Sequence, residues 1–243
     1  MVDSFGSITS RITFRNPAVQ SIAGKYRNIF VADTGKKLGY VDYSQYEVGI
    51  MTALSLDPVM CSYYDSGDLY SRVAEEIFEN IERRKDAKSL FLSFAYGMSI
   101  KNIGDAAREL GAERRRAVTF FRKFDIFEEW KKRIIEDFIA TGSVRTSEGN
   151  HMKVQQPTFV TYKERRSCIS QLVQGTASLI FKKALVKLCE EKEVDLLIPM
   201  HDAVFVQYPI EYDICKIQAI FETTFVSHFH GKIGVKTTAG SFA

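Results

Sequence analysis

The chain has 243 residues, of which 45% are hydrophobic and 26% are charged, with a net charge of +3. This composition is that of an ordinary globular protein with a sizeable core, and two subdomains are favoured over one. No apolar run reaches the ~18 residues of a membrane span, and the first residues are too polar for a signal peptide. The four cysteines lie far apart without a CxxC pair, which favours reduced thiols in a cytoplasm.

The basic residues are unevenly distributed along the chain. Four clusters stand out: Arg83, Arg84, Lys85 and Lys88; Arg114, Arg115, Arg116, Arg122 and Lys123; Lys131, Lys132 and Arg133; and Lys163, Arg165 and Arg166. A single cluster of this kind is usually a solvated helix face. Several of them together favour a phosphate backbone as partner.

The first strong structural signal lies at 37–55. An apolar run at 38–41 predicts a short strand, and from Ser44 onward apolar residues recur at helical spacing. Asp42 therefore lies where a strand ends and a helix begins, which is a rigid position for a metal ligand. Taken alone, an aspartate at such a place is more often a solvated turn residue.

The helix predicted at 83–99 carries a stripe of functional side chains. Arg84, Lys88, Leu92 and Tyr96 are four residues apart, so they follow one face over about 18 Å at ~1.5 Å per residue. Its N-terminal half combines two cations with the positive end of the helix dipole, which suits phosphates. The aromatic end of the stripe suits a base and a sugar.

The remaining periodicity predicts mostly helices. Helical segments are expected at 68–80, 103–111, 113–124, 127–140, 162–191 and 212–225, with a hairpin at 142–154 and a final strand at 234–238.

A second carboxylate lies in a setting similar to that of Asp42. Apolar runs at 196–200 and 203–208 flank His201 and Asp202, which predicts a β-hairpin with a polar tip. Burying these two groups is costly unless they are paired or bind a ligand. Two carboxylates from distant segments are what a two-metal phosphoryl-transfer site requires, because Mg²⁺ prefers oxygen ligands and bridges to substrate phosphates.

Four segments carry a family resemblance: DYSQYE at 42–47, RRKDAKSLFLSFAYGMS at 83–99, QGTA at 174–177 and HDA at 201–203. They resemble, in the same order, the motifs of family A DNA polymerases, the bacterial polymerase I type and its phage relatives. The likeness extends from Arg11 to the last strand.

The resemblance implies an α+β fold, with a polymerase palm (an antiparallel sheet with flanking helices) and a helical fingers subdomain. The implied division is 1–67 for the first part of the palm, 68–141 for the fingers and 142–243 for the second part of the palm. The late hairpin is expected to fold back beside the early strand, so that Asp42 and Asp202 share a pair of metal ions.

The implied activity is template-directed addition of deoxynucleotides to a primer 3′-OH with two Mg²⁺ ions. Asp42, Tyr43 and Asp202 would hold the metals, and Asp42, Asp202 and Lys88 would be catalytic, with Lys88 able to protonate the leaving pyrophosphate. Ala203 replaces the family's second hairpin carboxylate. Activity is therefore expected to be weakened but retained.

The resemblance also assigns the incoming nucleotide. The implied ligands are Gln45, Glu47, Tyr70, Arg84, Lys88, Leu92 and Tyr96. Glu47 would be the steric gate that excludes a 2′-OH, although it also completes a capping box with Ser44. Tyr70 replaces a family histidine, with core packing as the alternative, and Leu92 replaces an aromatic residue that packs on the sugar.

Contacts to DNA are implied at seven further positions: Arg11, Gln20, Gly97, Arg166, Ser170, Gln174 and His201. Arg11 and Gln20 belong to RITFRNPAVQSI, which resembles the family's minor-groove segment. An arginine there can test base-pair geometry, because every pair presents an acceptor in the minor groove. The alternative for Arg11 is an ordinary loop arginine. Ser170 replaces a usual asparagine.

The expected partners are primer-template DNA and a dNTP, without a membrane, in the cytoplasm of a bacterium or a phage-infected host. No thumb is recognisable before Arg11 and there is no room for an exonuclease. Met1 therefore begins either a fragment of a larger enzyme or, as favoured, a chain whose thumb or exonuclease comes from a second polypeptide. The rivals are a single-subunit RNA polymerase, which the Glu47 gate disfavours, and a catalytically weakened DNA-binding scaffold subunit.

Overall fold

The computed structural model describes residues 1–22, 24–153 and 160–241. The chain forms two compact units. We call the first the sheet unit; it comprises Met1–Ile50, Arg145–His151 and Gln171–Ala243. We call the second the helical unit; it comprises Met51–Val144 and Met152–Ser170. Each is described by itself.

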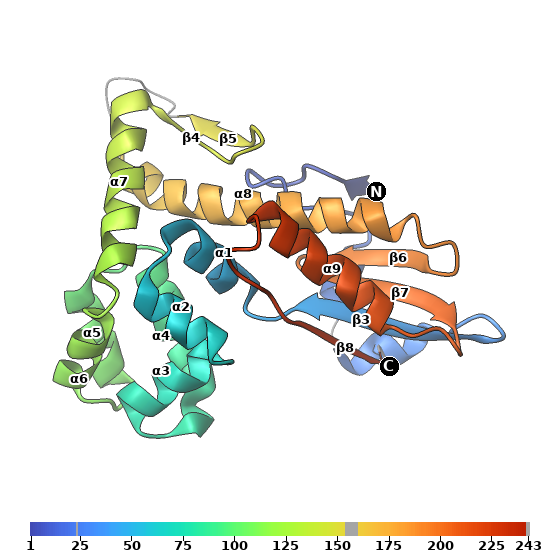
Figure 1. The fold of residues 1–243 in the computed structure, drawn as a ribbon, viewed down its shortest axis with the longest axis horizontal. Helices are drawn as coiled ribbons and strands as arrows, with labels where there is room; N and C mark the ends of the chain where they lie inside the picture. The colour runs from blue at the N-terminus through green and yellow to red at the C-terminus, as the bar shows by residue number, and fades with distance from the viewer. Residues whose placement is uncertain (23, 154–159, 242–243) are drawn as a thin grey trace. The chain divides into compact units, whose positions relative to one another are not determined.

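The sheet unit is built on a four-stranded antiparallel sheet of order β6-β7-β3-β8 (Figure 1). The strands are β3 (Lys36–Tyr43), β6 (Asp195–Met200), β7 (Ala203–Pro209) and β8 (Thr237–Ser241). Figure 1 shows the C-terminal part of α8 (Tyr162–Leu188) and α9 (Cys215–His228) side by side along this sheet.

Both faces of the central strands are covered, as the alternation of side chains requires. On the helix side, Tyr43 is buried, its ring lies 5.3 Å from that of Phe221 in α9 and its hydroxyl donates to the Phe221 carbonyl. The other side carries a small core around Phe205, against which Phe30 packs at 5.3 Å between ring centroids. For this reason every residue from Val204 to Tyr208 is buried.

Smaller elements complete the two units. The N-terminal segment contains β1 (Val2–Asp3) paired with β2 (Thr13–Phe14), then the 3-10 helices η1 (Val19–Ser21) and η2 (Gly24–Ile29). The helix α1 (Tyr46–Ser55) follows β3, and β4 (Ser143–Arg145) pairs with β5 (His151–Lys153).

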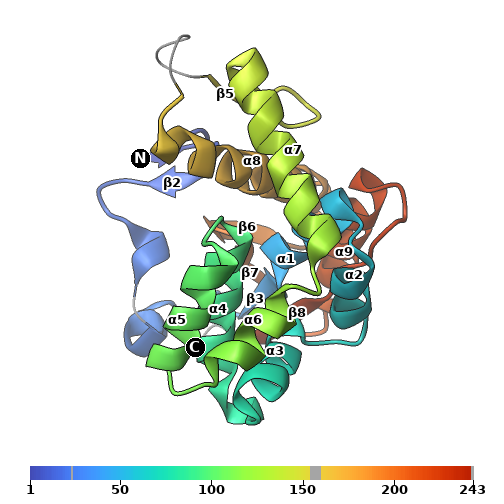
Figure 2. The same ribbon diagram turned by 90° about the vertical axis from the view of Figure 1, so that its left-hand side faces the viewer.

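The helical unit packs around phenylalanines. Its elements are α2 (Pro58–Asp65), α3 (Leu69–Phe78), η3 (Ile81–Arg83), α4 (Arg84–Ala95), α5 (Ile100–Glu109), α6 (Arg114–Phe121) and α7 (Asp125–Thr141); Figure 2 labels the α-helices among them. Phe94 and Phe121 are fully buried with ring centroids 4.7 Å apart. Asp57 is also fully buried; it accepts from Met60 N at 2.8 Å and from Phe127 N at 3.0 Å, which ties the start of α2 to α7.

Most predicted elements are present, and three of them are displaced. The helix expected at 103–111 is α5 (Ile100–Glu109), because the Ser99 hydroxyl accepts from Asn102 N and caps the helix there. The helix expected at 212–225 is α9 (Cys215–His228), because the Asp213 carboxylate accepts from Cys215 N and fixes the first turn there. The strand expected at 234–238 is β8 (Thr237–Ser241), where Glu222 accepts from both Thr237 N and Oγ1. The β1–β2 pair was not predicted. Among the described helices, none is long and apolar enough to cross a membrane.

Candidate active site

The two predicted aspartates lie on neighbouring backbone positions of the sheet unit. Asp42, near the end of β3, is in register with Ala203 at the start of β7, and Tyr43 N donates to the Asp202 carbonyl at 3.3 Å. The hairpin turns at His201, whose φ of 53° is left-handed. The tip of the late hairpin therefore does fold back beside the end of the early strand.

The Asp202 carboxyl lies in a largely buried setting. Burial raises its pKa above the ordinary value, and the charge of Glu47 adds to this. The charges of Arg11 and His201 act in the opposite direction without cancelling the shift. A carboxylate in this setting gains from a nearby cation, because a cation favours its charged form.

Arg11 and Glu47 form an ion pair in this neighbourhood. Arg11 Nη2 donates to Glu47 Oε1 at 2.6 Å, and the two side chains are 30% and 20% exposed. The helix α1 begins at Tyr46, after Gln45 with a φ of 51°. In a capping box the glutamate is the third residue of the helix. Glu47 is the second residue of α1, so it does not have the position that a capping box with Ser44 requires.

Two stacked tyrosines fix the turn between β3 and α1. The rings of Tyr43 and Tyr46 lie 4.1 Å apart at an interplanar angle of 5°. The Tyr43 hydroxyl donates to the Phe221 carbonyl and the Tyr46 hydroxyl to the Ala177 carbonyl, both at 2.8 Å. The backbone that carries Asp42 is therefore held against α8 and α9.

Sequence reasoning missed the residues that position the loop of Arg11. Ser10 has a left-handed φ of 58°; its carbonyl accepts from Ser178 at 2.5 Å and its hydroxyl accepts from Asn150 at 2.6 Å. Asn150 in turn accepts from Gln171 at 2.7 Å. No periodic pattern marks these single polar residues, so only the positions of the partners could have revealed them.

The carboxylate oxygens of Asp42 and Asp202 are the kind of donor atom that Mg²⁺ prefers. No group of three or more His, Cys, Asp or Glu side chains able to hold a metal occurs within the described ranges. Mg²⁺ nevertheless binds through one or two carboxylates completed by water and substrate phosphates. Asp42 and Asp202 offer carboxylate oxygens that match this pattern.

The stripe of α4 is present in the helical unit. Arg84 and Lys88 are exposed, and Leu92 and Tyr96 are half-buried. Arg84 holds Asp68 with two hydrogen bonds, of 2.5 and 3.1 Å. Partial burial acts to raise the pKa of Asp68, but the hydrogen bonds from Arg84 and Ser71 outweigh it and the pKa is lowered.

Tyr70 lies under the cations of this stripe. Its side chain is 4% exposed, its ring meets Phe91 edge-on, and Arg84 and Lys88 lie 5.3 and 5.7 Å from its centroid. The core-packing alternative for Tyr70 thus agrees with its position. Gly97 follows α4 with a φ of 101°, a conformation that favours glycine.

The other predicted DNA contacts are scattered. Gln20 and Gln174 are half-buried in the sheet unit, where His201 is exposed. The Gln20 Oε1 atom is buried and has no hydrogen-bond partner among the residues that the structure describes. Ser170 is half-buried and belongs to the helical unit. The Arg166 side chain lies outside what the structure describes.

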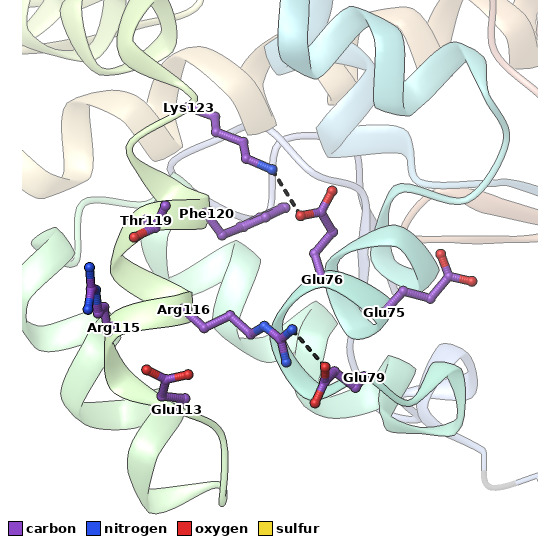
Figure 3. Close-up of a pocket in the computed structure, with 9 residues that line it drawn as sticks. All are labelled: Glu75, Glu76, Glu79, Glu113, Arg115, Arg116, Thr119, Phe120 and Lys123. Atoms are coloured by element: carbon purple, nitrogen blue, oxygen red, sulfur yellow. Dashed lines mark hydrogen bonds and ion pairs between the residues drawn. The ribbon is translucent and has the colours of Figure 1, made fainter.

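One cavity lies apart from the predicted site residues. It has a volume of about 770 Å³ and lies in the helical unit between α3 and α6 (Figure 3). Arg116 pairs with Glu79 at 2.7 Å and Lys123 with Glu76 at 2.9 Å, so charges from the two helices neutralise each other across it. None of the predicted site residues lines it.

Comparison with known proteins decides the family. The sequence model described as DNA polymerase family A matches residues 2–241. The chain belongs to DNA polymerase family A. The resemblance drawn from the motifs is therefore confirmed.

Individual bacterial DNA polymerases are similar in sequence to this chain. DNA polymerase I of Borreliella burgdorferi is 30% identical over 229 residues, covering 84% of this chain and 25% of the relative. The thermostable DNA polymerase I of Thermus thermophilus is 28% identical over 225 residues, covering 83% and 27%. The chain thus spans about a quarter of the length of these relatives.

A solved structure shares the fold. The POL domain of Pol1 from M. smegmatis, in complex with a DNA primer-template and dNTP, matches 99% of this chain and 47% of its own with a TM-score of 0.80 at 20% identity. The predicted α+β polymerase fold is confirmed. The boundaries 1–67, 68–141 and 142–243 and the roles of the single residues stay predictions.

Proposed function

We propose that this chain is the palm and fingers part of a DNA-directed DNA polymerase, which adds deoxynucleotides to a primer 3′-OH under direction of a template. The observation that carries the proposal is the adjacency of Asp42 and Asp202 on β3 and the β6–β7 hairpin in a family A chain. We assign 1–67 and 142–243 to the palm and 68–141 to the fingers.

Asp42 and Asp202 would hold two Mg²⁺ ions. Tyr43 would contribute a main-chain oxygen, because its ring and hydroxyl are committed to the contacts with Tyr46 and Phe221. When bound, the ions lower the pKa of the attacking hydroxyl and neutralise charge on the pyrophosphate. A bound cation would favour the charged form of Asp202 and so oppose the effect of burial, which raises its pKa.

Residues of the helical unit would bind the nucleotide. Arg84 would contact the γ-phosphate and Lys88 the α- and β-phosphates, with Lys88 also able to donate a proton to the pyrophosphate. A triphosphate must compete with Asp68 for Arg84, since both offer oxygens to the same guanidinium. Leu92 and Tyr96 would lie along the sugar and base, while Tyr70 supports the two cations from below.

Residues of the sheet unit would test the primer end. Arg11 would contact the minor groove, with Gln20, Gln174 and His201 as further DNA contacts. Other proposed positions are Gln45 for the nucleotide and Gly97, Arg166 and Ser170 for the template. Glu47 would exclude a 2′-OH, and its ion pair with Arg11 would couple sugar selection to primer contact.

A second polypeptide is proposed as partner. Palm and fingers alone offer a limited phosphate-contact area, and duplex DNA is held largely through its phosphates. A thumb or exonuclease from another chain would enlarge that area. Size-exclusion chromatography of the native protein tests this, and a lone monomer with full activity would contradict it.

Primer extension tests the function. Asp42→Asn and Asp202→Asn remove the metal-binding charge at nearly constant shape, and each should lower the extension rate by about a hundredfold or more. Asp65→Asn is the matched control, because Asp65 is an exposed carboxylate at the end of α2. It should leave the rate within about twofold.

The same assay separates the rivals. Extension with NTP in preference to dNTP would favour the RNA polymerase. If the wild type extends no primer with any candidate partner, while it still binds primer-template, the scaffold subunit replaces the polymerase as the conclusion. Mn²⁺ binding followed by electron paramagnetic resonance adds an independent readout, and both Asp→Asn variants should weaken it.

A further inference from the structure

A groove between α8 and α9 lies within the sheet unit, apart from the aspartates. It has a volume of about 520 Å³ and a mainly apolar lining. Leu179, Lys182, Val186 and Lys187 line it from α8, and Ser227 and His228 line it from α9. We call these six residues the lysine groove.

The α8 wall forms a continuous stripe. Leu179, Lys182 and Val186 are spaced three and four residues apart, so they lie on one face of the helix. Val186 is 66% exposed although it lies inside a helix of 27 residues. An exposed apolar residue on such a stripe can receive the apolar face of another helix.

The α9 wall is pre-formed. The His228 side chain is only 8% exposed, its ring meets Phe229 edge-on at 4.9 Å, and its Nδ1 lies 3.8 Å from the Glu148 carboxylate. Burial and the charge of Lys183 lower the pKa of His228. Packing therefore fixes the His228 ring in this wall, and the lowered pKa disfavours its charged form.

The positive charge of the groove is not fully balanced. Lys183 also lines the groove, and it pairs with Glu148. Within the part of the chain that the structure describes, Lys182 and Lys187 form no ion pair. Lys182 lies 4.0 Å over the ring of Phe5; partial burial lowers its pKa, and the charge of Asp3 opposes this shift without cancelling it. A nearby carboxylate from a ligand would offset this desolvation.

We propose that the lysine groove binds an amphipathic helix of a separate polypeptide, whose leucine-like side chains cover Leu179 and Val186 and whose acidic residues meet Lys182 and Lys187. Charge complementarity selects this occupant. Nucleic acid would use the lysines and leave the apolar strip uncovered, whereas an acidic amphipathic helix satisfies both.

A designed peptide provides the probe. It is a fluorescent helix of about 20 residues with leucines on one face and glutamates beside them. Its control replaces every glutamate by lysine. Fluorescence anisotropy with the full chain should show saturable binding of the acidic peptide, at least about tenfold tighter than the control peptide, and weaker binding at higher salt.

Variants locate the site. Val186→Asp and Lys187→Glu should each weaken binding of the acidic peptide about tenfold or more. Lys192→Glu is the matched control, because it makes the same charge change at an exposed position just beyond α8. It should leave binding within about twofold. Val186→Ser repeats the test without a new charge, and circular dichroism confirms that each variant is folded.

Several results would overturn the proposal. These are no saturable binding of the acidic peptide, equal binding of the lysine peptide, or an equal loss with Lys192→Glu. A labelled DNA duplex is titrated in parallel. Loss of duplex binding in Lys187→Glu but not in Lys192→Glu, without peptide binding, would make the groove a nucleic-acid site instead.

Discussion

Arg11 and Glu47 form a 2.6 Å ion pair between residues 36 positions apart in the chain. Both charges also act on Asp202, with Glu47 raising its pKa and Arg11 lowering it. The residues proposed for sugar selection, primer contact and metal binding thus influence one another electrostatically within the sheet unit.

Sugar selection should depend on the size of Glu47 more than on its charge. Glu47→Ala is expected to raise the ratio of NTP to dNTP incorporation, measured as kcat/KM, by about tenfold or more, because it opens space for the 2′-OH. Glu47→Gln keeps the volume and loses the ion pair with Arg11, so it should retain most of the discrimination. An unchanged ratio in Glu47→Ala would refute the gate.

The stability effect of Asp202 should depend on pH. Its pKa is raised in the folded state, so between the unfolded and the folded pKa the folded protein holds a proton that the unfolded chain has released. The resulting loss of unfolding free energy grows as pH rises from about 4 through the folded pKa. Asp202→Asn should therefore increase the free energy of unfolding near neutral pH, and this gain should shrink as pH falls to about 4. Urea unfolding at several pH values measures it.

Asp213 provides a control for this measurement, because its pKa is shifted in the opposite direction to that of Asp202. Its pKa is lowered by hydrogen bonds from Cys215, so the charged form stabilises the folded state above the unfolded pKa and this contribution is lost as pH falls through the folded pKa. Asp213→Asn should then destabilise the protein near neutral pH. Equal signs for the two variants would contradict the assigned electrostatics.

Nucleotide affinity should be limited by competition for Arg84. Because Asp68 occupies the guanidinium, Asp68→Asn is expected to lower the KM for dNTP, whereas Arg84→Ala should raise it about tenfold or more. Steady-state primer extension measures both. Lys85→Ala changes an exposed neighbouring cation and should have little effect; a similar rise of KM in that variant would argue for a diffuse charge effect.

Asp57 should be a main determinant of stability in the helical unit. Asp57→Ala leaves the amides of Met60 and Phe127 without their acceptor in the interior, which should cost about 2–4 kcal/mol of unfolding free energy. Denaturation followed by the fluorescence of Trp130, which is 6% exposed in this unit, measures the loss.

Exposed Asp65 provides the comparison for Asp57. Asp65→Ala should stay within about 0.5 kcal/mol of the wild type. Asp57→Asn, which keeps one acceptor oxygen, should fall between the two. A loss in Asp57→Ala no larger than that in Asp65→Ala would show that the two amides find other acceptors.

The sequence predicted the parts of the site that depend on long regular elements. The strand before Asp42 and the hairpin around Asp202 follow from apolar runs with polar ends, and the α4 stripe follows from a spacing of four. The adjacency of the two aspartates came from the resemblance to family A. It is realised through the pairing of Asp42 with Ala203.

The rest depends on single residues and distant partners. The strands β1 and β2 have two residues each, too few for a period of two to be visible. Asp57 and Phe127 are 70 positions apart, and nothing in either local segment indicates that contact. The ion pair of Arg84 with Asp68 and the left-handed Ser10 are similarly invisible without coordinates.

The position of β7 at the inside of the sheet has a dynamic consequence. Bonded to β3 on one edge and β6 on the other and buried from Val204 to Tyr208, its amides should exchange with deuterium among the slowest in the unit. Asp202 lies with His201 in the turn before this segment, and its carbonyl accepts from Tyr43 N. Protection against exchange should therefore extend to the backbone beside this carboxylate, where the turn is tied to β3.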